Sequence, residues 1–179
     1  IGSIILLAPI ARLIATGLTP IVNNTLIKIG DIIQSSTDAN PLIMGIVLGG
    51  IITVVGTAPL SSMALTALLG LTGAPMAIGA MAAFSSAFMN STLFHRLKLG
   101  DRKSTISVGI EPLSQADIVS ANPIPIYVTN FFGGAIAGII IAWSGMINNA
   151  TGTATPIAGF LVMFGFNSLT KVIIYGVVM

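Results

Sequence analysis

The sequence predicts an all-α, polytopic membrane protein with about five spanning or broken helices and one re-entrant loop. Composition is the first observation behind this prediction. The chain has 179 residues, of which 54% are hydrophobic and 7% are charged, whereas soluble domains carry about 25% charged residues. Charge placement is the second, because two long stretches contain no Asp, Glu, Lys or Arg. So little charge cannot cover a water-facing surface, and a lipid bilayer is the expected surrounding.

The same composition excludes several classes of function. The chain has no cysteine, which removes disulfides, thiolate catalysis and cysteine-bound metal clusters. One histidine and five carboxylates make a transition-metal site improbable, and we expect no cofactor. Seven Lys and Arg residues are too few for a phosphate-tracking surface, so nucleic acid is not an expected partner.

Two segments precede the first uncharged stretch. Residues 1–11 have no basic start and no clear cleavage site, so they indicate the remnant of a spanning helix and not a signal peptide, and residues 4–18 are apolar around Arg12. Residues 21–36 repeat Ile and Leu at near-helical spacing among polar residues, which predicts an amphipathic helix at the membrane interface. We expect residues 1–179 to form one integral membrane domain of a longer protein, because the chain begins without a start methionine and ends inside an apolar run.

The uncharged stretches set the expected crossings, since a helix needs about 20 apolar residues to span the hydrocarbon core. The first stretch holds a crossing over residues 42–58 and a second over residues 60–94, which Gly and Pro interrupt near residues 70–75. The second stretch holds a crossing over residues 127–147, a turn, and a crossing over residues 157–178.

Two GxxxG spacings fall inside these crossings, Gly45/Gly49 and Gly134/Gly138. Small residues on one helix face let helices approach closely in lipid, so we expect both pairs to lie at packing faces.

A basic loop follows the first stretch, and it holds Arg96, Lys98, Arg102 and Lys103 with Asp101. Short loops rich in Lys and Arg stay cytoplasmic, so this loop predicts the orientation of the protein. A solvated turn is the simplest interpretation, and docking of a soluble partner or of anionic lipid heads is the alternative.

Residues 104–125 predict the re-entrant loop. Three prolines exclude a continuous helix there, yet Glu111 and Asp117 lie among small and apolar neighbours. Irregular backbone enters a membrane only where protein or a water-filled cavity satisfies its polar groups. An ionisable residue at that depth indicates function by default, so the sequence predicts a binding site in this loop.

Five residues form the predicted substrate site, with no catalytic residue among them: Glu111, Gln115, Asp117, Asn122 and His95. Glu111 is the sharper candidate, because Asp117 could instead cap a helix or pair with a loop lysine. The neutral donors and acceptors of the loop suit a hydroxyl-rich solute. His95 either caps a helix end or contacts a solute at the cavity mouth, and Lys171 either reaches an interface or pairs with a carboxylate.

Several of these features together resemble a known family. They are the run from Asn40 to Gly50, the basic loop, the sequence Gly109-Ile110-Glu111-Pro112, the sequence Ala121-Asn122-Pro123 and the glycine-rich helix that follows. Over roughly residues 40–166 the chain resembles the C-terminal half of membrane subunits IIC (EIIC) of the bacterial sugar phosphotransferase system. The fructose-type arrangement and the divergent toxin-regulator-like group are the most similar.

The resemblance implies transport of a sugar or sugar-like solute across the bacterial cytoplasmic membrane. It also implies a multi-pass subunit that forms a homodimer. Glu111 would correspond to the family's signature carboxylate on the re-entrant loop. A cytoplasmic IIB-type phosphocarrier would supply the phosphoryl chemistry, so the chain would be at most the membrane subunit of a phosphotransferase. The threonine before the signature glutamate is absent, and Asn122 stands where the family has an acidic residue before proline.

Two other functions stay open. A membrane sensor or regulator that kept the EIIC fold without phosphotransfer is the first, and the departures around Glu111 favour it. An ion-coupled transporter, with Glu111 or Asp117 carrying a proton, is the second.

Overall fold

The computed structural model describes residues 2–37 and 40–179, and within those ranges the chain is helical, with no strand. The all-α prediction is therefore confirmed. The elements in chain order are α1 (Gly2–Thr37), α2 (Pro41–Thr57), α3 (Ser62–Leu68), α4 (Gly73–Leu97), α5 (Arg102–Ile110), the 3-10 helix η1 (Pro112–Gln115), α6 (Ala116–Ala121), α7 (Pro123–Ser144), α8 (Pro156–Met163) and α9 (Leu169–Val178).

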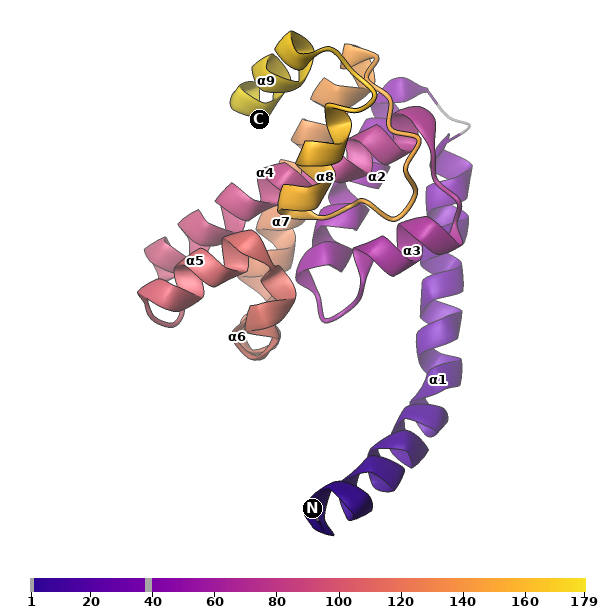
Figure 1. Ribbon diagram of the computed structural model, residues 1–179, viewed down its shortest axis with the longest axis vertical. Helices are drawn as coiled ribbons and strands as arrows, with labels where there is room; N and C mark the ends of the chain where they lie inside the picture. The colour runs from indigo at the N-terminus through magenta and orange to yellow at the C-terminus, as the bar shows by residue number, and fades with distance from the viewer. Residues whose placement is uncertain (1, 38–39) are drawn as a thin grey trace.

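Helix α1 projects away from the bundle formed by the other helices (Figure 1). The two expected N-terminal segments form one helix of 36 residues that contains Pro9 and Pro20. The hydroxyl of Thr19 donates to the carbonyl oxygen of Ala15 in the turn before Pro20. The last turns of α1 pack on the bundle, where Ile33 is fully buried.

Helices α2 and α7 pack against each other at their glycines. A Cβ atom on Gly45 would lie 2.7 Å from the carbonyl oxygen of Gly138, and one on Gly49 would overlap the carbonyl oxygen of Gly134. The backbones therefore touch where both GxxxG pairs meet, which confirms the expectation that these pairs are packing faces.

Helix α4 packs against both α2 and α7 and completes the centre of the bundle. Its buried face carries Met76, Ile78 and Met81, which join Leu48 and Ile52 of α2 in the main apolar core. Among the described residues, α4 and α7 are long and apolar enough to cross a membrane. The interruption predicted near residues 70–75 is confirmed, because α3 ends at Leu68 and α4 begins at Gly73.

The predicted crossing over residues 157–178 is wrong. The chain forms the short helices α8 and α9, with a turn between Met163 and Leu169. Asn167 holds this turn, because its side chain accepts a hydrogen bond from the Ile147 backbone N–H at 3.1 Å and donates to the Ile147 carbonyl at 2.8 Å. Hydropathy did not reveal this two-sided contact, which ties the turn to the end of α7.

Helix α8 begins inside the bundle, beside α4. A Cβ on Gly159 would lie 3.4 Å from the Cα of Ala80, and the ring of Phe160 stacks on that of Phe84 with centroids 4.1 Å apart. The segment before α8 meets the start of α3, where the Ser62 hydroxyl donates to the Ala154 carbonyl at 2.7 Å. The fold thus brings together the segment after Pro59, which precedes α3, and the segment before Pro156, which begins α8.

We predict that Gly49→Ala destabilises the protein by about 1–3 kcal/mol, because the added methyl group meets backbone that cannot move aside. Gly17→Ala is the matched control, since a Cβ at Gly17 would have no atom within 4 Å and alanine favours a helix. Thermal unfolding of both variants in detergent measures the difference. Equal midpoints for the two would contradict the close α2–α7 contact.

Candidate functional site

The segment that carries Glu111 returns along the helix from which it came. Helix α4 ends at Lys98, which has a left-handed conformation with φ 53°, and Gly100 follows with φ 71°. Helix α5 then runs back beside α4, so that a Cβ on Gly109 would lie 3.2 Å from the Ala87 carbonyl oxygen. Nine residues of helix cover about 13 Å, and α5 therefore places Glu111 well away from the α4–α5 turn.

The chain then comes back to its starting level through η1 and α6. A Cβ on Gly100 would lie 2.9 Å from the Cδ1 atom of Ile118 in α6. Phe94, Val108, Val119 and Ile126 form a small buried cluster that joins α4, α5, α6 and α7. Residues 102–121 thus form a hairpin of two helical arms, which we call the α5–α6 hairpin, with its tip at residues 111–115.

Glu111 lies at this tip because Pro112 ends α5. Pro112 is buried and η1 packs against α2, whereas the Glu111 side chain is exposed. Its carbonyl oxygen accepts hydrogen bonds from the Ser114 hydroxyl at 2.7 Å and the Ser114 N–H at 3.0 Å. Its carboxylate accepts only a long bond from the Leu113 N–H, at 3.4 Å. Within the described residues the carboxylate forms no ion pair, so it is available to a ligand.

Gln115 and Asp117 lie next to the tip. The Gln115 amide donates to the Ser114 carbonyl at 2.8 Å, which leaves its side-chain oxygen available as an acceptor. Asp117 is exposed in the first turn of α6. A carboxylate at that position also stabilises the helix through its dipole, so the structural role foreseen for Asp117 has a physical basis.

Asn122 and His95 lie at the base of the hairpin instead. Asn122 ends α6 and donates to the Ile118 carbonyl at 3.0 Å. His95 is exposed in the last turn of α4. The five predicted residues therefore divide into a group at the tip, namely Glu111, Gln115 and Asp117, and a group about 13 Å away at the base.

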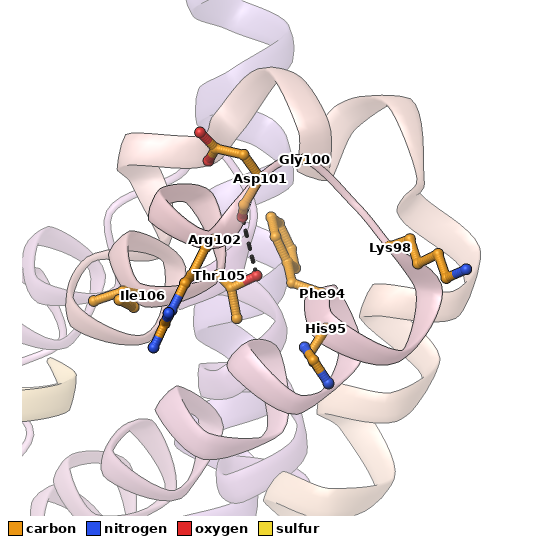
Figure 2. A pocket seen from close by; sticks show the side chains of 8 residues that line it. All are labelled: Phe94, His95, Lys98, Gly100, Asp101, Arg102, Thr105 and Ile106. Carbon is orange, nitrogen blue, oxygen red and sulfur yellow. Dashed lines mark hydrogen bonds between the residues drawn. The ribbon is translucent and has the colours of Figure 1, made fainter.

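A cavity of about 770 Å³ lies at the base, and Figure 2 shows the side chains that line it. The lining comes from the end of α4, the turn and the start of α5: Phe94, His95, Lys98, Gly100, Asp101, Arg102, Thr105 and Ile106. The Asp101 carboxylate points away from the Arg102 guanidinium and the His95 ring (Figure 2).

Asp101 caps α5. Its carboxylate accepts a hydrogen bond from the Ser104 N–H at 2.8 Å. This bond favours the charged form and lowers the pKa of Asp101 below its ordinary value of 3.8. The negative charge of the turn is therefore engaged in holding the helix.

A second polar group, which the sequence reading missed, lies at the α2–α4–α7 contact. Asn130 of α7 donates to the Asn90 side-chain oxygen at 2.7 Å, and Asn90 of α4 donates to the Thr57 hydroxyl at 3.2 Å. The Thr53 hydroxyl of α2 lies 2.8 Å from the Asn130 carbonyl. All four residues are at most 1% exposed. Their signal in the sequence is two asparagines within otherwise apolar, uncharged helices.

One atom of this network has no partner. The side-chain oxygen of Asn130 is buried without a hydrogen bond. Reversing its amide group would not help, because the amide nitrogen donates to two acceptors, the Asn90 oxygen and the Ile126 carbonyl. The network ties three helices together through directed hydrogen bonds, at the cost of one orphan acceptor.

Lys171 lies far from both carboxylates of the hairpin in the sequence, at the start of α9. Its ammonium group is 3.9 Å from the position of a Cβ on Gly145, the residue that ends α7. A cation at a helix C-terminus is favoured by the dipole. Lys171 thus contacts the end of a helix.

The comparison with protein families gives one finding. The family model described as "Phosphotransferase system, EIIC" matches residues 1–179. The comparisons with curated proteins and with solved structures return no match.

We predict that Asn130→Leu lowers the free energy of unfolding by about 1–3 kcal/mol, because it leaves the Asn90 oxygen buried without a donor. The double variant Asn90→Leu/Asn130→Leu should lose less than the sum of the single variants, since it removes both partners. Unfolding in detergent measures the cycle, with the exposed Asn24→Leu as control. Additive losses would contradict the coupling.

Proposed function

The chain belongs to the phosphotransferase system EIIC family, and we propose that it binds a sugar or sugar-like polyol at the tip of the α5–α6 hairpin. The family makes it a membrane component of a sugar transport system. The proposal adds the location of the site, with Glu111 as the principal ligand and Gln115 and Asp117 beside it. Its place is the bacterial cytoplasmic membrane, with several passes of the chain.

The free carboxylate of Glu111 carries the proposal. It lies at the end of an arm that α4 and the buried Pro112 hold in place. A carboxylate offers about four acceptor positions, and it can bind two neighbouring hydroxyl groups at once. Such charge-assisted bonds are stronger than those between neutral groups. A hydroxyl-rich solute therefore suits this position better than an apolar one.

The proposed mechanism needs no catalytic residue from this chain. In a phosphotransferase, a IIB-type phosphocarrier would bring the phosphoryl group to the cytoplasmic face. The membrane subunit would hold the solute hydroxyl in line and keep water away, which removes the entropic cost of bringing two reactants together. We propose that the hairpin is the predicted re-entrant loop, with its base at the cytoplasmic end and its tip toward the solute.

His95 and Asn122 take a secondary place in this proposal. They lie at the base of the hairpin, where α4 and α6 end. If the basic turn faces the cytoplasm, as its charge predicts, these residues would meet the solute after it leaves the tip. We assign them to the side from which the solute leaves.

A homodimer is part of the proposal, and α7 offers a face for it. Apolar side chains of α7 are exposed at intervals of four residues, from Ile124 through Val128 and Phe132 to Ile136. This stripe lies on the opposite side of the helix from Gly134 and Gly138, which pack on α2. A second copy or lipid would cover it.

The alternative function is a membrane sensor with the EIIC fold and no phosphotransfer. The sequence around Glu111 favours it, because Pro112 follows the glutamate directly and is buried against the bundle. The proline fixes the tip in one conformation, which suits binding better than a cycle of opening and closing. Addition of purified, phosphorylated partner subunits separates the two functions. A phosphorylated solute indicates transport, and bound but unmodified solute indicates sensing.

We predict that Glu111→Gln weakens solute binding by about 10- to 100-fold, because a neutral amide replaces a charge-assisted acceptor. Binding of a panel of radiolabelled sugars and polyols to proteoliposomes measures the loss. Asp31→Asn is the matched control, since Asp31 is an exposed carboxylate on α1. Unchanged affinity of Glu111→Gln for every solute that the wild type binds would remove Glu111 from the site.

A further inference from the structure

We propose that the groove between the end of α4 and the start of α5 binds an anionic phospholipid. Its phosphate would lie at Arg102, with Lys98 as a second cation on the other side of the cavity, and one acyl chain would lie along α5. The proposed solute site takes no part in this proposal, because the groove lies at the other end of the hairpin.

Basic side chains are concentrated at the turn between α4 and α5. Five cationic or ionisable basic side chains are exposed within nine residues of the turn: His95, Arg96, Lys98, Arg102 and Lys103. Asp101 is the acidic residue among them, and its carboxylate is held by the Ser104 N–H. Three of the basic side chains line the cavity, and in Figure 2 Arg102 and Lys98 lie on either side of His95 and point away from each other. An arginine fork matches a phosphate group, and the neighbouring cations add to the attraction.

The groove is the cavity at the base of the hairpin, and its size and walls suit a lipid headgroup. The cavity of about 770 Å³ lies within the range of small-molecule sites, about 300–1,000 Å³. It is larger than an inorganic phosphate needs. Its walls change from polar to apolar, since Phe94 and Ile106 line it together with the basic residues.

The exposed face of α5 carries apolar residues after Arg102, and these favour a lipid over a soluble anion. Arg102, Ile106 and Ile110 follow one another at intervals of four residues and therefore share one face of the helix. Ile106 is 56% exposed and Ile110 is 54% exposed. A cation followed by an apolar stripe fits a molecule that has a charged head and a hydrocarbon tail.

The backbone of Lys98 has an unusual conformation for a residue with a side chain. It has a left-handed conformation, with φ 53°, and glycine is the residue that favours this position at the end of a helix. A side chain there costs stability. Strain of this kind is found at functional positions, and Lys98 supplies one of the cations that line the cavity.

This geometry predicts opposite effects of one substitution. Lys98→Gly should raise the thermal midpoint of the lipid-free protein by about 2–4 °C, because it relieves the left-handed strain. It should also weaken lipid binding by about fivefold, because it removes one cation from the membrane surface. A purely structural turn would give the first effect without the second.

The test uses the full chain, delipidated in a neutral detergent and titrated with dioleoyl phosphatidylglycerol, with binding followed by native mass spectrometry. We expect Arg102→Gln to weaken binding about fivefold and Ile106→Ser to weaken it as well, with Lys28→Gln of α1 unchanged as control. Thermal midpoints without lipid show that each variant is folded. Should Arg102→Gln fail to fold, Lys98→Gly supplies the same charge test.

Three outcomes would overturn the proposal. Equal affinity for dioleoyl phosphatidylcholine would show that the negative headgroup is not recognised. Binding of glycerol phosphate or inorganic phosphate as tightly as the lipid, with no effect of Ile106→Ser, would assign the groove to a soluble phosphate. Equal loss in Lys28→Gln and Arg102→Gln would show that lipid adheres to any exposed cation.

Discussion

The contact between the backbones of α2 and α7 is the constraint on which the rest of the fold depends. Gly45 and Gly49 meet Gly138 and Gly134 without side chains between them. In a bilayer the hydrophobic effect does not drive helices together, so close packing and hydrogen bonds must do so. The glycines bring the helices near enough for the Thr53 hydroxyl to reach the Asn130 carbonyl. The polar network at the centre of the bundle thus follows from the glycine contact.

This arrangement also positions the hairpin. Asn130 binds Asn90 of α4, and α4 in turn supports α5 through the contact of Ala87 with Gly109. The glycine contact, the amide network and the hairpin arm form one continuous set of packed elements. The position of Glu111 therefore rests on α4, and α4 rests on the glycine contact of α2 with α7.

The sequence predicts the helical class, the two GxxxG faces, and the interruption before Gly73, because each depends on local composition. It also predicts that Pro112 ends a helix beside Glu111. It fails at residues 157–178, where the turn depends on a contact between Asn167 and Ile147, twenty residues away. It likewise places His95 and Asn122 with Glu111, although spacing along a hairpin separates its base from its tip. Long-range contacts are not visible in hydropathy.

The two ends of the hairpin have different chemistry, and for this reason we propose a different ligand for each. The tip has an unpaired carboxylate among neutral amides, which favours hydroxyl groups. The base has exposed cations and an apolar stripe, which favours an anionic amphiphile. Because α5 joins the two ends, its nine residues keep them about 13 Å apart, so one ligand would not contact the other.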